Sequence, residues 1–243
     1  MLLAQAAENV VSCSMELGGN APFLVLADAD LDAALEGALI AKMRNNGQSC
    51  IAANRFYVDA AVAEMFSSAL ARAMGDMPVG SGLDPNVKVG PVINDPARQK
   101  MLGLVNEATD HGARVLTGGK APNRPGYFVS PTVLTQVPAD EHILNEEIFG
   151  PIAPVVTFRD PSEAIAFANK TDRGLAAYVY TRDLAKGLAV AEAIESGMVG
   201  LNRGFISDPA APFGGVKQSG LGREGAHEGL LEFLETKYIA TKW

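Results

Sequence analysis

The feature that most constrains the fold is an alternation of short apolar runs with longer runs in which apolar residues recur every three or four positions. Residues 23–26 are a short apolar run, and Asp30 can then cap a helix whose apolar positions keep helical spacing. Residues 55–58 and 62–73 repeat this pairing of a strand with an amphipathic helix. The alternation predicts an α/β domain, in which helices pack against a sheet.

The rest of the chain continues this pattern. Turn and cap residues predict two further helices, at about 95–112 and about 183–197. Residues 75–95 and 117–127 are rich in Gly, Pro and Asn, so we expect loops there. Residues 236–243 alternate loosely between polar and apolar types and predict a terminal strand with an exposed edge.

Composition excludes several classes of protein. The 243 residues can bury one large core or two small ones. The net charge is −8 and no basic cluster occurs, which argues against a nucleic-acid partner, and no apolar run is long enough for a membrane span. Cys13 and Cys50 form no CxxC pair and no signal peptide is recognisable, so we expect a cytoplasmic protein with reduced thiols. The three histidines lack ligand spacing, so we expect no metal site.

Two polar segments contain the residues with the clearest chemistry. Cys50 ends the run Asn-Asn-Gly-Gln-Ser-Cys, which is too polar and turn-prone for a core strand, and Glu16 precedes Leu-Gly-Gly. A thiolate attacks a carbonyl carbon well, and a carboxylate can activate water to hydrolyse the resulting thioester. The glycines after Glu16 would permit close backbone approach. The alternatives are an inert buried cysteine and a solvated turn glutamate.

Four motifs together resemble the aldehyde dehydrogenase superfamily. They are residues 15–20 (Met-Glu-Leu-Gly-Gly-Asn), 45–50, 146–151 (Glu-Glu-Ile-Phe-Gly-Pro) and 212–220 (Pro-Phe-Gly-Gly-Val-Lys-Gln-Ser-Gly). In that family the cysteine of the second motif is the nucleophile and the glutamate of the first is the general base. The resemblance therefore implies these roles for Cys50 and Glu16, whereas Cys13 is expected to be a small structural residue.

The resemblance also implies the architecture. We expect the family's catalytic domain, an open, twisted, mostly parallel sheet flanked by helices. The family begins with a dinucleotide-binding domain of roughly 200 or more residues, which we expect to be absent from this chain. Residues 1–16 would be a remnant of the cofactor domain and linker, 17–230 the catalytic domain, and 231–243 a strand that pairs with a neighbouring subunit. We therefore expect a homo-oligomer, and a chain that is inactive alone.

The implied reaction is the oxidation of an aldehyde to a carboxylic acid, with NAD or NADP as the cofactor. Cys50 would attack the aldehyde to give a thiohemiacetal, hydride would pass to the nicotinamide, and Glu16 would activate the water that hydrolyses the thioester. The third motif would place Glu147 beside the nicotinamide ribose and Phe149 beside the ring. The alternative for this motif is a charged turn followed by a core aromatic residue.

One residue narrows the substrate. Arg44, six positions before Cys50, resembles the arginine with which succinate semialdehyde dehydrogenases hold the distal carboxylate of a small aldehyde. Ser207 matches a serine that bonds the same carboxylate, and Phe213 resembles an aromatic residue of the substrate tunnel. If Arg44 instead pairs with a structural acid, a generic aldehyde or another acidic semialdehyde is the alternative. A further alternative is a non-enzymatic fragment that self-associates. Ala52 stands where some relatives have a second cysteine, so we expect no local disulfide switch.

Overall fold

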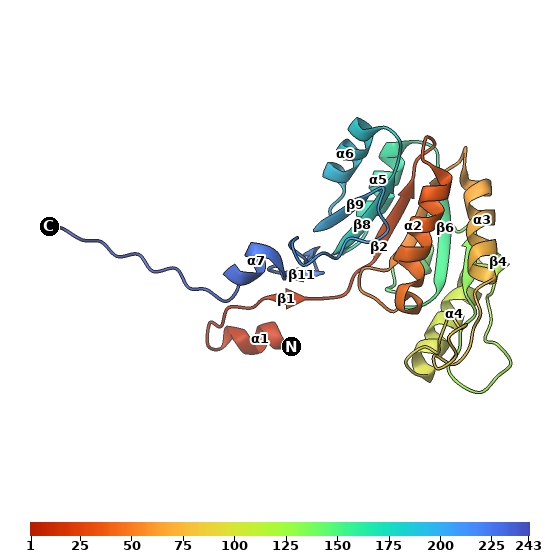
Figure 1. Ribbon diagram of the computed structural model, residues 1–243, viewed down its shortest axis with the longest axis horizontal. Helices are drawn as coiled ribbons and strands as arrows, with labels where there is room; N and C mark the ends of the chain where they lie inside the picture. Colours follow the sequence, from red (N-terminus) through yellow and green to blue (C-terminus); the bar gives the residue numbers. More distant parts are fainter.

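The structure is a computed structural model that describes residues 1–243, and its centre is a seven-stranded, mostly parallel sheet (Figure 1). In spatial order the strands are β4 (Arg114–Thr117), β5 (Thr132–Thr135), β6 (Ile152–Phe158), β3 (Ala53–Asp59), β2 (Ala21–Val25), β8 (Ala176–Tyr180) and β9 (Met198–Leu201). Every neighbouring pair is parallel except β4 and β5. The predicted α/β class and parallel sheet are confirmed.

Helices cover both faces of the sheet. One face packs against α2 (Leu31–Met43) and α3 (Ala63–Gly75), and the other against α4 (Asp95–Asp110), α5 (Pro161–Asn169), α6 (Leu184–Ala193) and the short helix η2 (His142–Leu144). The predicted helix starts are correct, because the Asp30, Asn94 and Asp183 side chains each accept a hydrogen bond from a backbone N–H of the first turn. The chain therefore forms three layers around two hydrophobic cores.

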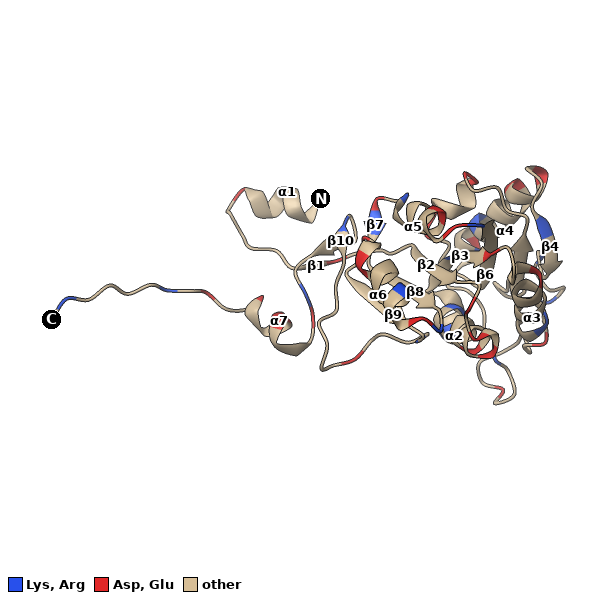
Figure 2. Ribbon diagram, turned by 90° about the horizontal axis from the view of Figure 1, so that it is seen from above, with Lys and Arg blue, Asp and Glu red and all other residues tan.

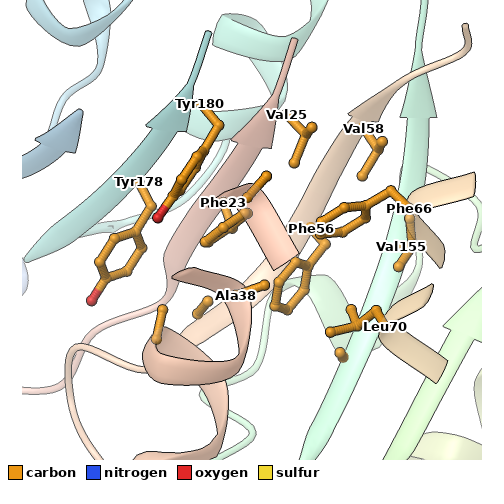
Figure 3. Close-up of a cluster of buried hydrophobic side chains, with 14 of the residues drawn as sticks. Phe23, Val25, Ala38, Phe56, Val58, Phe66, Leu70, Val155, Tyr178 and Tyr180 are labelled. Atoms are coloured by element: carbon orange, nitrogen blue, oxygen red, sulfur yellow. The ribbon is translucent and has the colours of Figure 1, made fainter. Parts of the chain in front are cut away.

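Strand β2 shows why both faces are apolar. Phe23 and Val25 point into the core under α2 and α3, whereas Leu24 and Leu26 point into the opposite core. The ring of Phe23 lies 5.2 Å from that of Phe56 and 4.9 Å from that of Tyr180, measured between centroids (Figure 3). Aromatic pairs at this separation add to the burial of apolar area, so the sheet centre is held rigidly. The candidate site lies just before the amino ends of β2 and β3.

A smaller extension projects from one side of the body (Figure 1). It contains helix α1 (Leu2–Ala7), helix α7 (Ala226–Leu231) and the antiparallel pair β1 (Met15–Glu16) and β11 (Gly220–Leu221). A second antiparallel pair, β7 (Arg173–Gly174) and β10 (Val216–Lys217), connects the extension to the body. The chain passes from β1 directly into β2, so Glu16 lies close to where the extension joins the body.

The predicted strand over residues 236–243 does not form in the single chain. These residues have no secondary structure and are exposed along their length, and they extend away beyond α7 (Figure 1). The physical reason is that a strand needs a neighbouring backbone for its hydrogen bonds, and no segment of this chain lies beside it.

The surface carries mixed charge. Lys and Arg lie among Asp and Glu over the α/β body, without a continuous basic face (Figure 2). None of the helices combines the length and the apolar character that crossing a membrane would require.

Candidate active site

The structure brings Glu16 and Cys50 together, although they lie on different segments. Glu16 ends strand β1, which is fixed by its pairing with β11 and by a hydrogen bond from Leu17 N to Ser219 O of 3.1 Å. Cys50 lies in the turn between the short helix η1 (Arg44–Gly47) and β3. The thiol and the carboxyl group lie close enough for each to shift the pKa of the other. A thiol and a carboxylate in this arrangement have the chemistry of a nucleophile and of a base that activates water.

The glycines after Glu16 are required by this close approach. A Cβ atom on Gly19 would lie 2.2 Å from the carbonyl oxygen of Cys50, and one on Gly18 would lie 2.6 Å from Oε2 of Glu147. At Gly19 the obstacle is backbone, so a side chain does not fit, whereas at Gly18 the obstacles are the ends of the Glu147 and Arg173 side chains, which would have to move. The expected close backbone approach is therefore present, and it packs the first motif against the second and the third.

The electrostatics of the pair keep the proton on sulfur. Burial, followed by the negative charge of Glu16, raises the pKa of the Cys50 thiol to about 11. Burial also raises the pKa of Glu16, and the carboxylates of Glu224 and Glu147 add to this rise, whereas the hydrogen bond from Cys50 opposes it. A raised carboxyl pKa makes Glu16 a stronger base, which suits a group that must remove protons.

This pairing predicts how fast the thiol reacts in the chain itself. In a Cys13→Ser background, the rate of Cys50 alkylation by iodoacetamide should rise about tenfold per pH unit up to about pH 10, because the thiolate fraction does so below a pKa near 11. Glu16→Gln should accelerate alkylation at about pH 8, because it removes the charge that disfavours the thiolate. Stopped-time mass spectrometry measures both rates. A plateau below about pH 9, or a slower Glu16→Gln variant, would contradict the proposed coupling.

The third motif lies against the first. The Gly19 N–H donates a hydrogen bond of 3.0 Å to Oε1 of Glu147, and Lys100 Nζ donates to the backbone oxygen of Glu147 at 3.2 Å. Phe149 is 40% exposed and has a φ of 54°, so its ring is held out of the core by a left-handed backbone. An aromatic residue in this state is not the core residue of the alternative interpretation. The Glu147 carboxylate lies close enough to Glu16 to raise the pKa of Glu16.

Arg44 has no acidic partner in the chain. It follows the last residue of α2, is exposed, and takes part in none of the ion pairs. Its guanidinium carbon lies 4.9 Å from the centroid of the Phe205 ring. Arg44, Ser49, Tyr178 and Phe205 line one small, narrow pocket. The alternative of a structural ion pair is therefore not realised, and the cation faces a pocket beside the Cys50 turn.

The other two predicted substrate residues lie in the loops after β9. Ser207 is half-buried, two positions beyond Phe205, and its hydroxyl makes no hydrogen bond within the chain. Phe213 is half-buried against the same hydrophobic core as Cys50, and its backbone pairs with Glu224 through two hydrogen bonds of 2.7 Å. The structure thus places Phe213 beside the acid that raises the pKa of Glu16.

Sequence reasoning missed two residues of this site. Tyr178 donates a hydrogen bond of 2.7 Å to the backbone oxygen of Ile51, and its burial raises its pKa while Arg44 lowers it. Glu224 acts on Glu16 through its charge. No local pattern could have identified Tyr178, which reads as an ordinary aromatic residue of a buried strand. Glu224 lies four residues past the fourth motif, and only its spatial approach to Glu16 gives it significance.

Metal-ligating side chains gather at one place that the sequence spacing did not predict. Ligand atoms of Glu107, His111 and Glu141 lie within 4.8 Å of one another. His111 Nδ1 lies 3.0 Å from Glu141 Oε2, and His142 Nδ1 lies 3.0 Å from Glu107 Oε2. Within the chain these histidine–carboxylate pairs connect α4 to η2, so they are accounted for as structural contacts.

Comparisons with known proteins agree with these motifs. The model of the aldehyde dehydrogenase family matches residues 1–239. A succinate-semialdehyde dehydrogenase from Paenarthrobacter nicotinovorans is 56% identical over 238 residues, covering 98% of this chain and 53% of that protein. A glutarate-semialdehyde dehydrogenase from Pseudomonas aeruginosa is 49% identical, covering 98% of this chain and 49% of that protein.

Solved structures give the same relationship. A crystal structure described as an Escherichia coli NADP-dependent enzyme superposes with a TM-score of 0.96 at 50% identity, covering 98% of this chain and 50% of that chain. The chain therefore spans about half the length of the relatives it matches.

Proposed function

The chain belongs to the aldehyde dehydrogenase family, and we propose that it supplies the catalytic half of an enzyme that oxidises succinate semialdehyde to succinate with NAD or NADP. The observation that carries this proposal is the placement of an unpaired cation, Arg44, on the same short loop as Cys50, which faces Glu16. A nucleophile, a base and a carboxylate-binding group are the parts that an acidic aldehyde requires.

Cys50 and Glu16 have separate roles in the proposed reaction. The Cys50 thiol loses its proton to solvent, and the thiolate attacks the aldehyde carbon to form a thiohemiacetal. The Cys50 backbone N–H would stabilise the oxyanion that forms. When bound, the nicotinamide cofactor accepts hydride from the same carbon, which leaves a thioester on Cys50. Glu16 then removes a proton from water, the water attacks the thioester, and the acid leaves as the thiol reforms.

The third motif fits the cofactor that this chemistry needs. Glu147 presents a carboxylate next to Gly18, close enough to Glu16 to raise the pKa of Glu16. Carboxylates bind ribose hydroxyls as acceptors, and the exposed Phe149 ring offers an apolar surface to a flat nicotinamide. These two residues would hold the nicotinamide end of the cofactor, while the rest of the dinucleotide requires a binding domain of the kind found in the relatives' other half.

A longer acidic semialdehyde is the second candidate substrate. The relative from Pseudomonas aeruginosa carries the name glutarate-semialdehyde dehydrogenase, and its substrate differs from succinate semialdehyde by one methylene. One methylene usually changes selectivity by roughly 10- to 200-fold in a fitted pocket. The spacing between Arg44 and Cys50 would therefore decide between the two substrates.

The proposal is tested by an aldehyde panel on a complete enzyme in which this chain is joined to a dinucleotide-binding half. We expect NAD(P)H formation with kcat/KM for succinate semialdehyde at least about tenfold above that for glutarate semialdehyde and for butanal. Absorbance at the reduced-nicotinamide band measures all three rates. A preference for butanal would remove the acidic substrate class, and a preference for glutarate semialdehyde would replace the four-carbon substrate with the five-carbon one.

A further inference from the structure

The loop that carries both Arg44 and Cys50 has an unfavourable backbone. Asn45 and Asn46 have φ values of 51° and 57°, and Gly47 follows with 73°, so three successive residues are left-handed. Asparagine tolerates this region better than most residues, and glycine is needed at the third position. A Cβ atom on Gly47 would lie 2.3 Å from the backbone oxygen of Gly150. A loop in this state persists only when its surroundings hold it.

A buried hydrogen bond joins the two ends of this loop. Lys42, in the last turn of α2, is completely buried, and its Nζ donates to Oδ1 of Asn54 at 3.0 Å. Asn54, which is 2% exposed, lies in strand β3 just beyond the turn. Lys42 has no acidic partner and no second side-chain contact of this kind. The bond thus spans the segment 43–53 inside the core.

The position of Asn54 in the sheet is unusual. Ala21 pairs with Ala53, and the next residue, Pro22, pairs with Arg55, so the register shifts at Asn54 in the manner of a β-bulge. Bulges free one residue from the ladder and redirect its side chain, and they occur often beside active sites. The bulge therefore explains how a strand residue can turn its amide towards the end of α2.

The amine can make this bond in either charge state. Burial lowers the pKa of Lys42 to about 7, and both a neutral amine and an ammonium group donate to an amide oxygen. A buried polar pair costs free energy unless it is hydrogen-bonded, and Lys42 and Asn54 satisfy each other at the base of the strained loop.

The opposite side of the loop is held by two further contacts. The Gly90 N–H donates to Oδ1 of Asn46 at 3.3 Å, and the Ile93 N–H donates to Oε1 of Gln48 at 3.0 Å. Both donors belong to the exposed loop before α4. The loop is therefore fixed from the core by Lys42 and Asn54 and from the surface by residues 90–93.

We propose that Lys42 and Asn54 form a buried clamp whose role is to hold the strained loop 44–50, and thereby to fix the spacing between Arg44 and Cys50. Lys42 is a positioning residue, since it touches neither substrate nor the reacting sulfur. Because Arg44 would bind the distal carboxylate and Cys50 the aldehyde carbon, this spacing sets the chain length of the substrate. The statement that this spacing sets the chain length of the substrate rests on the proposed function.

The test replaces both polar partners by apolar residues, in Lys42→Met/Asn54→Leu, within a Cys13→Ser background of this chain. Removing both members of a buried polar pair leaves no unsatisfied group, so the unfolding free energy should be unchanged or higher. A purely structural pair predicts that nothing else changes. The clamp predicts faster hydrogen exchange of amides 45–52 and an at least fivefold change in the rate at which Cys50 reacts with neutral propyl methanethiosulfonate.

The preference for substrate length is measured with reagents that place a carboxylate at different distances from the reacting sulfur. Carboxyethyl methanethiosulfonate has the length of succinate semialdehyde, carboxypropyl methanethiosulfonate is one methylene longer, and the propyl and butyl reagents are their neutral controls. In the clamped chain the carboxyethyl reagent should react about tenfold faster than its neutral control, from a charge-assisted contact discounted for exposure. The double variant should lose the difference between the two lengths, and Arg44→Ala should lose the preference for carboxylates at both lengths.

Two controls separate the possible outcomes. Val190→Ala opens a cavity in the other core and lowers stability without touching the loop, so it should leave exchange at residues 45–52 and the reagent rates unchanged. Asn54→Asp keeps an acceptor oxygen and should retain the properties of the unmodified chain. Unchanged exchange and unchanged neutral-reagent rates in the double variant would overturn the clamp. If the unmodified chain showed no preference for carboxylate reagents, the substrate role of Arg44 would be wrong. The clamp would then be tested by hydrogen exchange of residues 45–52 alone.

Discussion

Replacement of Cys50 by alanine in the complete enzyme should lower the rate of aldehyde oxidation by about 1,000-fold or more, the scale on which loss of an enzymatic nucleophile is felt. The sulfur forms the only covalent bond to substrate in the proposed mechanism, and no histidine or second cysteine accompanies it in the site. Cys13, which is the other thiol, lies in the extension and points towards the backbone oxygen of Val11 at 3.5 Å. Cys13→Ala should therefore retain full activity, and it is the matched control for the loss of a thiol.

Glu16→Gln should give a different defect from that of Cys50→Ala. The amide is uncharged, so hydride transfer can still follow attack by the thiolate, but the thioester has no base to activate water. We expect a burst of reduced cofactor equal to the number of active sites, followed by a slow steady state. Single-turnover and steady-state absorbance measurements separate these phases. If both variants lost the burst equally, Glu16 would serve mainly in activating Cys50, and the assignment as the base for hydrolysis would fail.

Local patterns predicted most of the layered body. The apolar run at residues 23–26 and the strand-like run at residues 55–58 became β2 and β3, because burial on both faces of a parallel sheet favours apolar side chains. The helix starts at Asp30 and Asp183 were predictable because capping is a contact with residues two or three positions away. Such features depend on near neighbours, and a single sequence contains that information.

The tail shows where this local information ends. Residues 236–243 have strand-like alternation, but a strand is stabilised by the backbone beside it. The single chain offers no neighbour, and the segment stays extended and exposed. The pattern alone could not show whether a partner for it lies within the chain.

The candidate site also contains some residues that local motifs predict and others that only the folded structure shows. The motifs predicted roles for Cys50, Glu16, Glu147 and Phe149, and the structure packs Gly18 against Glu147 and Gly19 against Cys50. The interactions that tune them come from distant parts of the chain.

The groups that tune and position the motif residues could not be predicted. Glu224 raises the pKa of Glu16, Tyr178 binds the backbone after Cys50, and Lys42 reaches the bulged Asn54. A lysine two positions before Arg44 reads as a solvated helix residue, and only the path of α2 against β3 shows that it is buried.

The substrate assignment depends on Arg44, and Arg44→Ala in the complete enzyme should lower kcat/KM for succinate semialdehyde by about 10- to 200-fold. This range corresponds to the loss of a charge-assisted contact worth about 1.5–3 kcal/mol. Arg44→Lys should recover only part of the loss, because an ammonium group cannot match the two oxygens of a carboxylate as a guanidinium does. Steady-state rates of cofactor reduction measure each variant.

The comparison with a neutral aldehyde of similar length decides what Arg44 does. Butanal has no distal carboxylate, so Arg44→Ala should leave its kcat/KM unchanged or raise it by removing a cation from the wall of the pocket. Arg44 also packs over the Phe205 ring, and losing that contact could shift the loop that holds Cys50. Such a shift would depress oxidation of both aldehydes together. Equal losses on both substrates would therefore assign Arg44 to the support of the loop, and the proposed substrate would revert to a generic aldehyde.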